Sequence, residues 1–272
     1  MPEPIHVNND RSNRKTEMRM QFNAATSDYD AGPGAFAHFG KRLVDVAAIT
    51  PGNRVLDVAS GRGAVLFPAA EKAGASGDAV GVDFAEEMVR ATNQDVARLG
   101  LRVRVLLMDA EHLDFPDAAF DRVLCGFGIM FFPNQERALE EFRRVLRPGG
   151  RLAVSTWHTH QVKEVDFAMT AAGLMPPRSP GWIKEPDQLA RLLTATGFSN
   201  VHVNMDTHSF RYVNVDDYWG QARGTGLRRT LDSLDSAQTE RVRSALVERM
   251  RQHQRPDGFY VAATALLAVA NR

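Results

Sequence analysis

The sequence predicts an α/β protein with a doubly wound, mostly parallel sheet. Short apolar runs typical of strands alternate with amphipathic helical stretches from about residue 51 to residue 157. Parallel strands need a crossover between them, so this alternation is typical of a parallel sheet covered by helices. Two of the predicted strands, at residues 55–58 and 79–83, carry an aspartate near the carboxyl end, where such sheets bind ligands.

Composition and charge narrow the class of protein. The chain has 272 residues, with 33 lysines and arginines against 33 aspartates and glutamates, so its net charge is zero. Proteins that bind nucleic acids usually carry a basic surface, so we expect no nucleic-acid partner.

The apolar runs and the cysteine content of the sequence indicate the cellular compartment in which the protein is expected. The longest apolar run, residues 261–270, contains Thr264 and is too short to cross a bilayer, and the first ten residues have no apolar core that could act as a secretory signal. Cys125 is the single cysteine, so no internal disulfide can form. We therefore expect a cytoplasmic protein with no membrane partner.

The chain is expected to form one domain with additions at both ends. Residues 1–13 are polar and are expected to be a disordered tail, with residues 14–272 forming the domain. The parts of that domain are helices forming an N-terminal cover at 14–50, the ligand-binding half at 51–157, and lid-like insertions at 158–184 and 214–256.

The stretch from Val55 to Val65, V-L-D-V-A-S-G-R-G-A-V, combines a buried strand with a tight turn of small residues. Gly61 and Gly63 can adopt positive φ and let the backbone approach a ligand closely. The helix that follows points free N–H groups at whatever lies there. Asp57 is costly inside a buried strand unless it hydrogen-bonds, so we interpret the stretch as a ligand-binding turn; a purely structural turn is the alternative.

This stretch resembles the V-L-D-x-G-x-G-x-G motif of the class I methyltransferases, with Ala59 in place of the first glycine. The resemblance implies a seven-stranded, Rossmann-like sheet with S-adenosylmethionine as cofactor and S-adenosylhomocysteine as product. It also implies that the methionine half of the cofactor is held by Asp57, Ala59, Ser60, Gly61 and Gly63.

A nicotinamide-dinucleotide fold is the main alternative. Its fingerprint G-x-G-x-x-G would need glycine at Leu66 if it began at Gly61, and it would lack its first glycine if it began at Ala59. An acid inside the strand is also foreign to that fingerprint.

The second and third strands are expected at residues 79–83 and 103–107, with a helix at 85–99 between them. The second strand ends at Asp83, and the resemblance implies that this carboxylate binds both ribose hydroxyls, since two hydroxyl donors suit one ionised acceptor. The third leads to M-D-A-E, where the resemblance implies an acid that accepts from the adenine amino group. The residues assigned to this end of the cofactor are Asp83, Phe84, Met88, Asp109, Ala110 and Glu111.

The fourth and fifth strands are expected around residues 123–125 and 152–157. The segment C-G-F-G-I-M-F-F-P after the fourth strand suits a loop that touches the cofactor sulfonium and the substrate. A helix capped by Asn134 leads into L-R-P-G-G-R-L, a pattern that again resembles the family. Loop residues assigned to the cofactor are Cys125, Gly126 and Met130; Cys125, with no base beside it, is interpreted as a buried small side chain rather than a nucleophile.

Beyond Trp157 the resemblance weakens. We expect a helix at residues 185–196, a strand at 201–205 that is extended or joined by another at 210–213, and helical segments at 216–229 and 236–252. Residues 260–270 are expected to form the last strand, antiparallel to its neighbours.

Aromatic residues outside the motifs favour an apolar pocket for a bulky, mostly apolar small molecule. The residues assigned to substrate are Phe22, Phe127, Phe131, Trp157, Phe167, Trp182 and Trp219, and the resemblance makes Tyr29 a cofactor or substrate contact. Core packing is the alternative for the aromatic set, and a surface position beside a turn is the alternative for Tyr29.

His158 and His160 follow the fifth strand at the edge of the sheet where sites form. Either is a candidate general base for a hydroxyl, an amine or an enol-type carbon, and a loop histidine with no catalytic role is the alternative. The eight histidines are otherwise scattered, so no metal site is expected.

The sequence therefore predicts an S-adenosylmethionine-dependent methyltransferase that acts on O, N or C of an apolar small molecule, in secondary-metabolite biosynthesis. One alternative is a methyltransferase-like cyclase that binds the cofactor without transferring its methyl group. A cofactor-free scaffold is disfavoured because it would not need Asp57, Gly61, Gly63 or Asp83. Both a monomer and a homodimer are compatible with the sequence.

Overall fold

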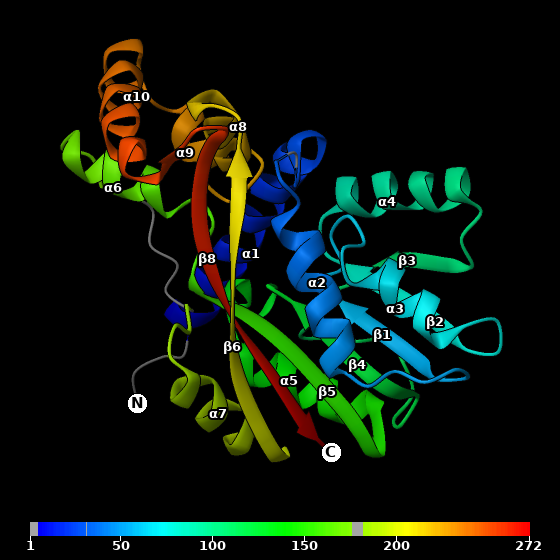
Figure 1. Cartoon of the computed structure of the whole chain (residues 1–272). Coiled ribbons are helices and arrows are strands. Elements are labelled where there is room, and N and C mark those ends of the chain that lie inside the picture. The colour runs from blue at the N-terminus through cyan, green and yellow to red at the C-terminus, as the bar shows by residue number, and fades with distance from the viewer. Residues whose placement is uncertain (1–4, 31, 176–181) are drawn as a thin grey trace.

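The computed structural model of the protein describes residues 5–30, 32–175 and 182–272, and it has one sheet with helices on both faces (Figure 1). The strands are β1 (Arg54–Val58), β2 (Asp78–Asp83), β3 (Val103–Leu107), β4 (Phe120–Gly126), β5 (Leu146–Thr159), β6 (Ser199–Tyr212), β7 (Gln254–Arg255) and β8 (Gly258–Asn271). The helices are α1 (Ile5–Ala25), α2 (Ala35–Val46), α3 (Leu66–Ala73), α4 (Glu86–Leu99), α5 (Gln135–Val145), α6 (Lys163–Ala171), α7 (Pro186–Ala195), α8 (Val215–Arg223), α9 (Arg228–Asp232) and α10 (Ser236–Met250).

The strand order is β3-β2-β1-β4-β5-β8-β6, and β7 adds a short pairing to β8. The strands β1 to β5 pair in parallel, whereas β8 is antiparallel to both β5 and β6. The doubly wound, mostly parallel sheet of seven main strands is confirmed, and so is the antiparallel last strand. The chain adds β2 and β3 on one side of β1 and then returns to add β4 and β5 on the other side. Between β1 and β4 the strand order therefore reverses, and in such sheets a crevice opens there at the carboxyl ends of the strands.

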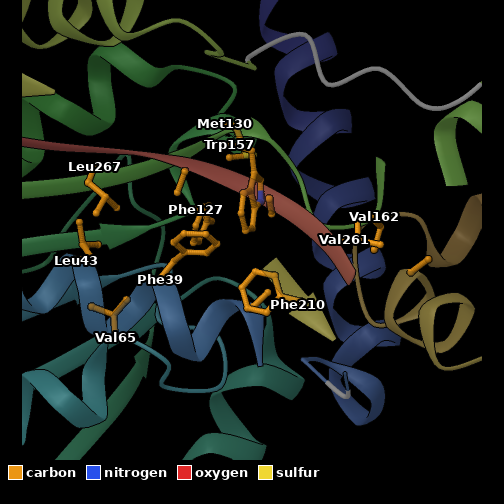
Figure 2. Close-up of a cluster of buried hydrophobic side chains, with 14 of the residues drawn as sticks. Phe39, Leu43, Val65, Phe127, Met130, Trp157, Val162, Phe210, Val261 and Leu267 are labelled. Carbon is orange, nitrogen blue, oxygen red and sulfur yellow. The ribbon is translucent and has the colours of Figure 1, made fainter. Parts of the chain in front are cut away.

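Two apolar cores lie on the two faces of the sheet because side chains alternate along each strand. Val55 of β1 joins the core under α2 and α3, whereas its neighbour Leu56 joins the core under α5 and α7. Figure 2 shows part of the first core, where Phe39 and Leu43 of α2 lie near Phe127, Trp157 and Phe210.

The structure differs from the sequence prediction in the bounds of several elements: β5 begins at Leu146, and the helical segment expected at 216–229 forms α8 and α9. Helix α1 begins at Ile5, so residues 5–13, expected to belong to a disordered tail, are helical; no glycine or proline interrupts the stretch after Pro4. The predicted tail at residues 1–4 lies outside the described residues. Strand β6 runs without a break from Ser199 to Tyr212, because it pairs with β8 along that length, so of the two predicted alternatives the extended strand is the one observed.

Helices α6, α8, α9 and α10, which come from the stretches expected to be insertions, lie together above one end of the sheet (Figure 1). Helix α6 follows β5 and packs on α10, which belongs to the second insertion. A buried carboxylate joins the two: Glu164 of α6 accepts from Arg249 Nε at 2.6 Å and lies 3.0 Å from His253 Nε2. The residues between β5 and α6 are thereby held at the edge of the sheet where the parallel strands end.

Candidate functional site

A cavity of about 890 Å³ lies at the carboxyl ends of the central strands. Its walls come from α1, the turn after β1, the ends of β2 and β3, the loops after β4 and β5, and the segment from Thr225 to Ser233. The volume lies toward the upper end of the range for small-molecule sites.

The turn after β1 is held in a left-handed backbone conformation. The φ angles of Ala59, Gly61 and Gly63 are 58°, 50° and 83°. The turn is fixed to the neighbouring strand because the Ser60 amide donates to the Val82 carbonyl at 3.0 Å. Ala59 and Gly61 border the cavity, whereas Ser60 and Gly63 are not among its lining residues.

Asp83, at the end of β2, accepts a hydrogen bond from this turn. Its Oδ2 accepts from the Gly61 amide at 2.8 Å and its Oδ1 from the Ala85 amide at 3.0 Å. Each carboxylate oxygen keeps a lone pair for a further donor, so Asp83 can still bind a pair of hydroxyls on the cavity side. Burial raises the pKa of Asp83, opposed by these backbone donors.

Asp57 lies one strand away, and its side chain is unusual. The residue is 1% exposed, and neither carboxylate oxygen has a hydrogen bond of ordinary geometry within the described chain. Burial and the neighbouring charge of Asp83 raise its pKa well above the usual range, with the Leu66 amide acting in the opposite direction. A buried carboxyl group without a partner costs free energy, so a donor from a bound ligand or water would stabilise it. Asp57 itself does not border the cavity.

The expected adenine end contains a residue that sequence analysis missed. Lys15 of α1 donates from Nζ to Asp109 Oδ2 at 2.6 Å and to Glu111 Oε2 at 2.7 Å. Burial would lower the pKa of Lys15, but the hydrogen bonds to the two carboxylates outweigh it and raise the pKa. All of the residues assigned to this end border the cavity: Asp83, Phe84, Met88, Asp109, Ala110 and Glu111.

The end of β4 contributes Gly126 to the cavity wall, and the loop after it contributes Met130. Cys125 is buried and is not among the lining residues. Burial raises the pKa of its thiol, which favours the neutral form. Phe127 takes a left-handed backbone conformation, φ 56°, and its ring stacks on Trp157 with centroids 4.0 Å apart (Figure 2).

Aromatic side chains line the other part of the cavity. Five of the seven aromatic residues assigned to substrate are among the lining residues, namely Phe22, Phe127, Phe131, Trp157 and Trp182. Tyr29 is also there, stacked on Phe36 with centroids 5.0 Å apart, and its ring lies 3.5 Å from the position of a Cβ added to Gly61.

The other two aromatic residues lie elsewhere. Phe167 is 51% exposed, and the Arg249 guanidinium carbon lies 4.3 Å from its ring centroid. The Arg243 guanidinium carbon lies 5.4 Å from the centroid of Trp219. Neither residue borders the cavity.

The two candidate histidines have different surroundings. His158 Nδ1 lies 2.8 Å from the Lys184 carbonyl, and His158 is not a lining residue. His160 borders the cavity, and its Nε2 lies 2.9 Å from Asp166 Oδ2. Asp166 was not identified from the sequence, although its position six residues after His160, at a helix start, is a weak local signal.

The described ranges hold no group of three or more His, Cys, Asp or Glu side chains placed to bind a metal ion. They also hold no helix of the length and apolarity that crossing a membrane requires. The arrangement can bind a ligand that offers hydroxyl and amino donors at one end, and a flat apolar ligand beside it.

Comparison with known proteins gives a consistent result. A family model described as "Methyltransferase domain" matches residues 55–150. The aklanonic acid methyltransferase DauC of Streptomyces sp. (strain C5) is 38% identical over 147 residues, which are 53% of this chain and 67% of that protein. The nocamycin O-methyltransferase of Saccharothrix syringae is 42% identical over 138 residues, 50% of this chain but only 49% of that protein. The solved structure of the YcgJ protein from Bacillus subtilis has a TM-score of 0.60 at 19% identity, covering 86% of this chain and 98% of that one, which shows a shared fold.

Proposed function

The chain belongs to the class I S-adenosylmethionine-dependent methyltransferases, and on that premise we propose that it transfers a methyl group to a small, mostly apolar molecule. One observation carries the proposal. The same cavity is bordered by the turn after β1, where Gly61 donates to Asp83, and by a wall of aromatic side chains. A cofactor and an apolar acceptor can therefore lie in contact without water between them.

The residues present fit the cofactor. Asp83 keeps acceptor capacity for the ribose hydroxyls, and the unpartnered carboxyl group of Asp57 suits the methionine amino group, directly or through a water. We assign the adenine amino group to Asp109, whose Oδ1 already accepts from the Glu111 amide at 2.9 Å. The cofactor supplies an electrophilic methyl group on a sulfonium.

The chain's own residues position the acceptor and remove its proton. Phe127, Trp157 and Trp182 offer flat apolar surfaces, and His160 is the residue we propose as general base. His158 faces a backbone carbonyl outside the cavity, so we do not assign it a catalytic role.

The substrate class is also part of the proposal. The two relatives described above are named for aklanonic acid and nocamycin, and this chain shares with them a region of about half its length. Together with the aromatic wall, this supports a polycyclic or polyketide-like acceptor in natural-product biosynthesis. The cytoplasmic location and the oligomeric state stay predictions from the sequence.

Calorimetric titration with S-adenosylmethionine tests the cofactor assignment. We expect Asp83→Ala to weaken binding by about 10- to 100-fold, the value of one hydrogen bond to a charged group. Asp78→Ala, at the opposite end of the same strand and away from the cavity, is the matched control and should bind normally. Equal affinity of both variants would contradict the assignment.

Product analysis tests the reaction. Methylated product and S-adenosylhomocysteine should form in equal amounts when aromatic hydroxy compounds are supplied. Turnover without S-adenosylhomocysteine would instead support a cyclase that uses the cofactor without consuming it.

A further inference from the structure

A polar corner interrupts the aromatic wall of the cavity. His160, Gln161 and Asp166, which we call the polar corner, come from the end of β5 and the start of α6, and all three border the cavity. The His160 ring lies against Trp182, with centroids 4.9 Å apart. Polar groups in an otherwise apolar pocket are the ones that fix a ligand's orientation.

Two atoms of the polar corner are shielded from solvent and have no hydrogen-bond partner within the described chain, Gln161 Oε1 and Asp166 Oδ1. Gln161 is 2% exposed, so its side chain is held in place by its neighbours. Leaving a buried acceptor unpaired costs about 1–3 kcal/mol. A hydrogen-bond donor that reached either atom would remove that cost.

Asp166 has no cationic partner in the described chain other than the His160 ring. Its Oδ2 accepts the proton of Nε2, which leaves the lone pair of the imidazole on Nδ1. A residue of the cavity wall thus carries a proton acceptor, with a carboxylate beside it that offsets the charge of an imidazolium.

We propose that the polar corner selects an acidic hydroxyl, a phenol or enol on a flat ring system, as the methyl acceptor, and that Gln161 binds a second donor beside it. In this assignment Asp166 is a positioning residue for His160, and Gln161 determines specificity. The inference rests on the proposed methyl transfer and narrows its open acceptor, O, N or C, to oxygen.

The proton and electron balance of the step is simple. The hydroxyl proton moves to Nδ1 of His160, and an oxygen lone pair forms the new O–C bond. The C–S bond breaks with its electron pair left on sulfur, which gives the neutral thioether and the methyl ether. The imidazolium then releases its proton to solvent.

Other acceptors match the polar corner less well. A carboxylate is already ionised, needs no base, and would lie beside the charge of Asp166. An ammonium group would be attracted, but its nitrogen has no lone pair with which to attack. A neutral amine offers a donor, so it is compared directly in the experiment.

The experiment measures binding of four anthraquinones to protein saturated with S-adenosylhomocysteine, using the fluorescence of the cavity-lining Trp157 and Trp182. The probes carry two adjacent hydroxyls, one amino group, one carboxylate, or no substituent. We expect the dihydroxy compound to bind at least tenfold more tightly than the unsubstituted one. Gln161→Leu should remove most of that advantage, while Gln188→Leu, an exposed glutamine on α7, should keep it.

Methyl transfer to the dihydroxy compound separates positioning from binding. Asp166→Asn should lower kcat at least tenfold and change KM less than threefold, because it removes the negative charge behind the base while the asparagine keeps an oxygen that can accept from a ligand. The exposed Asp187→Asn of α7 should leave both unchanged. His160→Ala should lower kcat as far as Asp166→Asn does or further.

Tighter binding or faster methylation of the amino or carboxylate compound overturns the inference, as does an equal response of all four probes to Gln161→Leu. These results differ from a failure of the proposed function itself. In that case the same preparations would not bind S-adenosylmethionine and would form no S-adenosylhomocysteine from any acceptor.

Discussion

Asp57 and Asp83 show how two buried carboxyl groups on adjacent strands acquire different properties. Burial raises the pKa of both, yet Asp83 accepts two backbone hydrogen bonds and Asp57 has none of ordinary geometry. Asp83 therefore stabilises the turn before any ligand arrives, whereas Asp57 is stabilised only when a ligand or water supplies a donor. Asp83 thus serves both the fold and the proposed cofactor site, whereas Asp57 contributes no such hydrogen bond to the fold.

Ala59 is the one departure from the glycine motif, and its φ of 58° is strained for a residue with a side chain. We expect Ala59→Gly to raise the free energy of unfolding by about 0.5–1 kcal/mol, because relief of that strain exceeds the added entropy of the unfolded chain. Urea denaturation measures it. A cofactor affinity that stays within threefold would show that the alanine is a matter of stability alone.

A second variant, at Gly128, tests whether the side chain of Ala59 restricts its surroundings. A Cβ on Gly128 would lie 2.6 Å from the Ala59 Cβ, so Gly128→Ala should be destabilising. It should cost less when combined with Ala59→Gly, because one of its clashes is removed. Strictly additive effects would mean that the two positions do not restrict each other.

Asp30 gives a pH dependence of stability with a defined sign. Burial raises its pKa from 3.8 to about 6, although the backbone amides of Phe36 and Ala37 favour the ionised form. Between about pH 4 and pH 6 the folded protein then holds more protons than the unfolded chain, so the free energy of unfolding falls as pH rises through that window. Asp57 and Asp83 act in the same direction.

Asp30→Asn should therefore reduce the fall in stability across that pH window, measured by urea denaturation at several pH values. Asp78→Asn, at the half-buried first residue of β2, is the control and should keep the wild-type slope. An unchanged slope in Asp30→Asn would show that other groups carry the dependence.

At the scale of an element, α1 covers the cofactor end of the cavity through a few specific contacts. Lys15 joins it to Asp109 and Glu111, and Asn23 joins it to α4, donating to Glu86 at 2.9 Å. Helix α1 has little amphipathic character, since its residues are mostly polar, so these contacts decide where it lies.

Lys15→Met should loosen α1 more than a surface substitution does, because it leaves the buried Glu111 carboxylate without its cation. Limited proteolysis should cut α1 faster, and S-adenosylmethionine should bind several-fold more weakly. Arg19→Met is the matched control on the same helix. Its ion pair with Glu86 is 3.4 Å long and largely exposed, so its loss should change little. Equal effects of both variants would contradict the role given to Lys15.

At the scale of the whole molecule, segments far apart in sequence close the same cavity. Gln21 of α1 donates to the Gly226 carbonyl at 2.5 Å, and Arg228 pairs with Asp28. The N-terminal segment and residues 226–228 therefore meet and form one cover over the cavity.

Ligand binding should stabilise both parts of this cover together. At S-adenosylhomocysteine about 100-fold above its Kd, binding adds about 2.7 kcal/mol to the free energy of unfolding. We expect hydrogen exchange to slow in α1 and in residues 225–233, with no comparable change in α7, which does not border the cavity. Slower exchange in one of the two segments but not the other would show that they move independently.

The sequence by itself determined the alternating strands and helices, the strand-ending acids and the glycine turn. These depend on local signals: the burial period of strands, the spacing of helical apolar residues and the conformational freedom of glycine. The predicted bounds of β3 agree with the structure, and the assigned residues of the ribose and adenine end all border the cavity. Resemblance to known methyltransferases added the cofactor.

Only the tertiary structure decided which side chains face the cavity. Lys15 contacts Asp109 across 94 residues of sequence, a pairing that no local pattern encodes. His160 and His158 are equivalent in the sequence, but the pairing of β5 with β8 shifts register between Trp157 and Thr159, and only His160 borders the cavity. Phe167 and Trp219 are aromatic residues like Trp182, so the sequence does not distinguish them. In the structure they pack against arginines outside the cavity. An aromatic side chain is stabilised by any apolar neighbour, so its place follows from how distant segments pack and not from its own residue type.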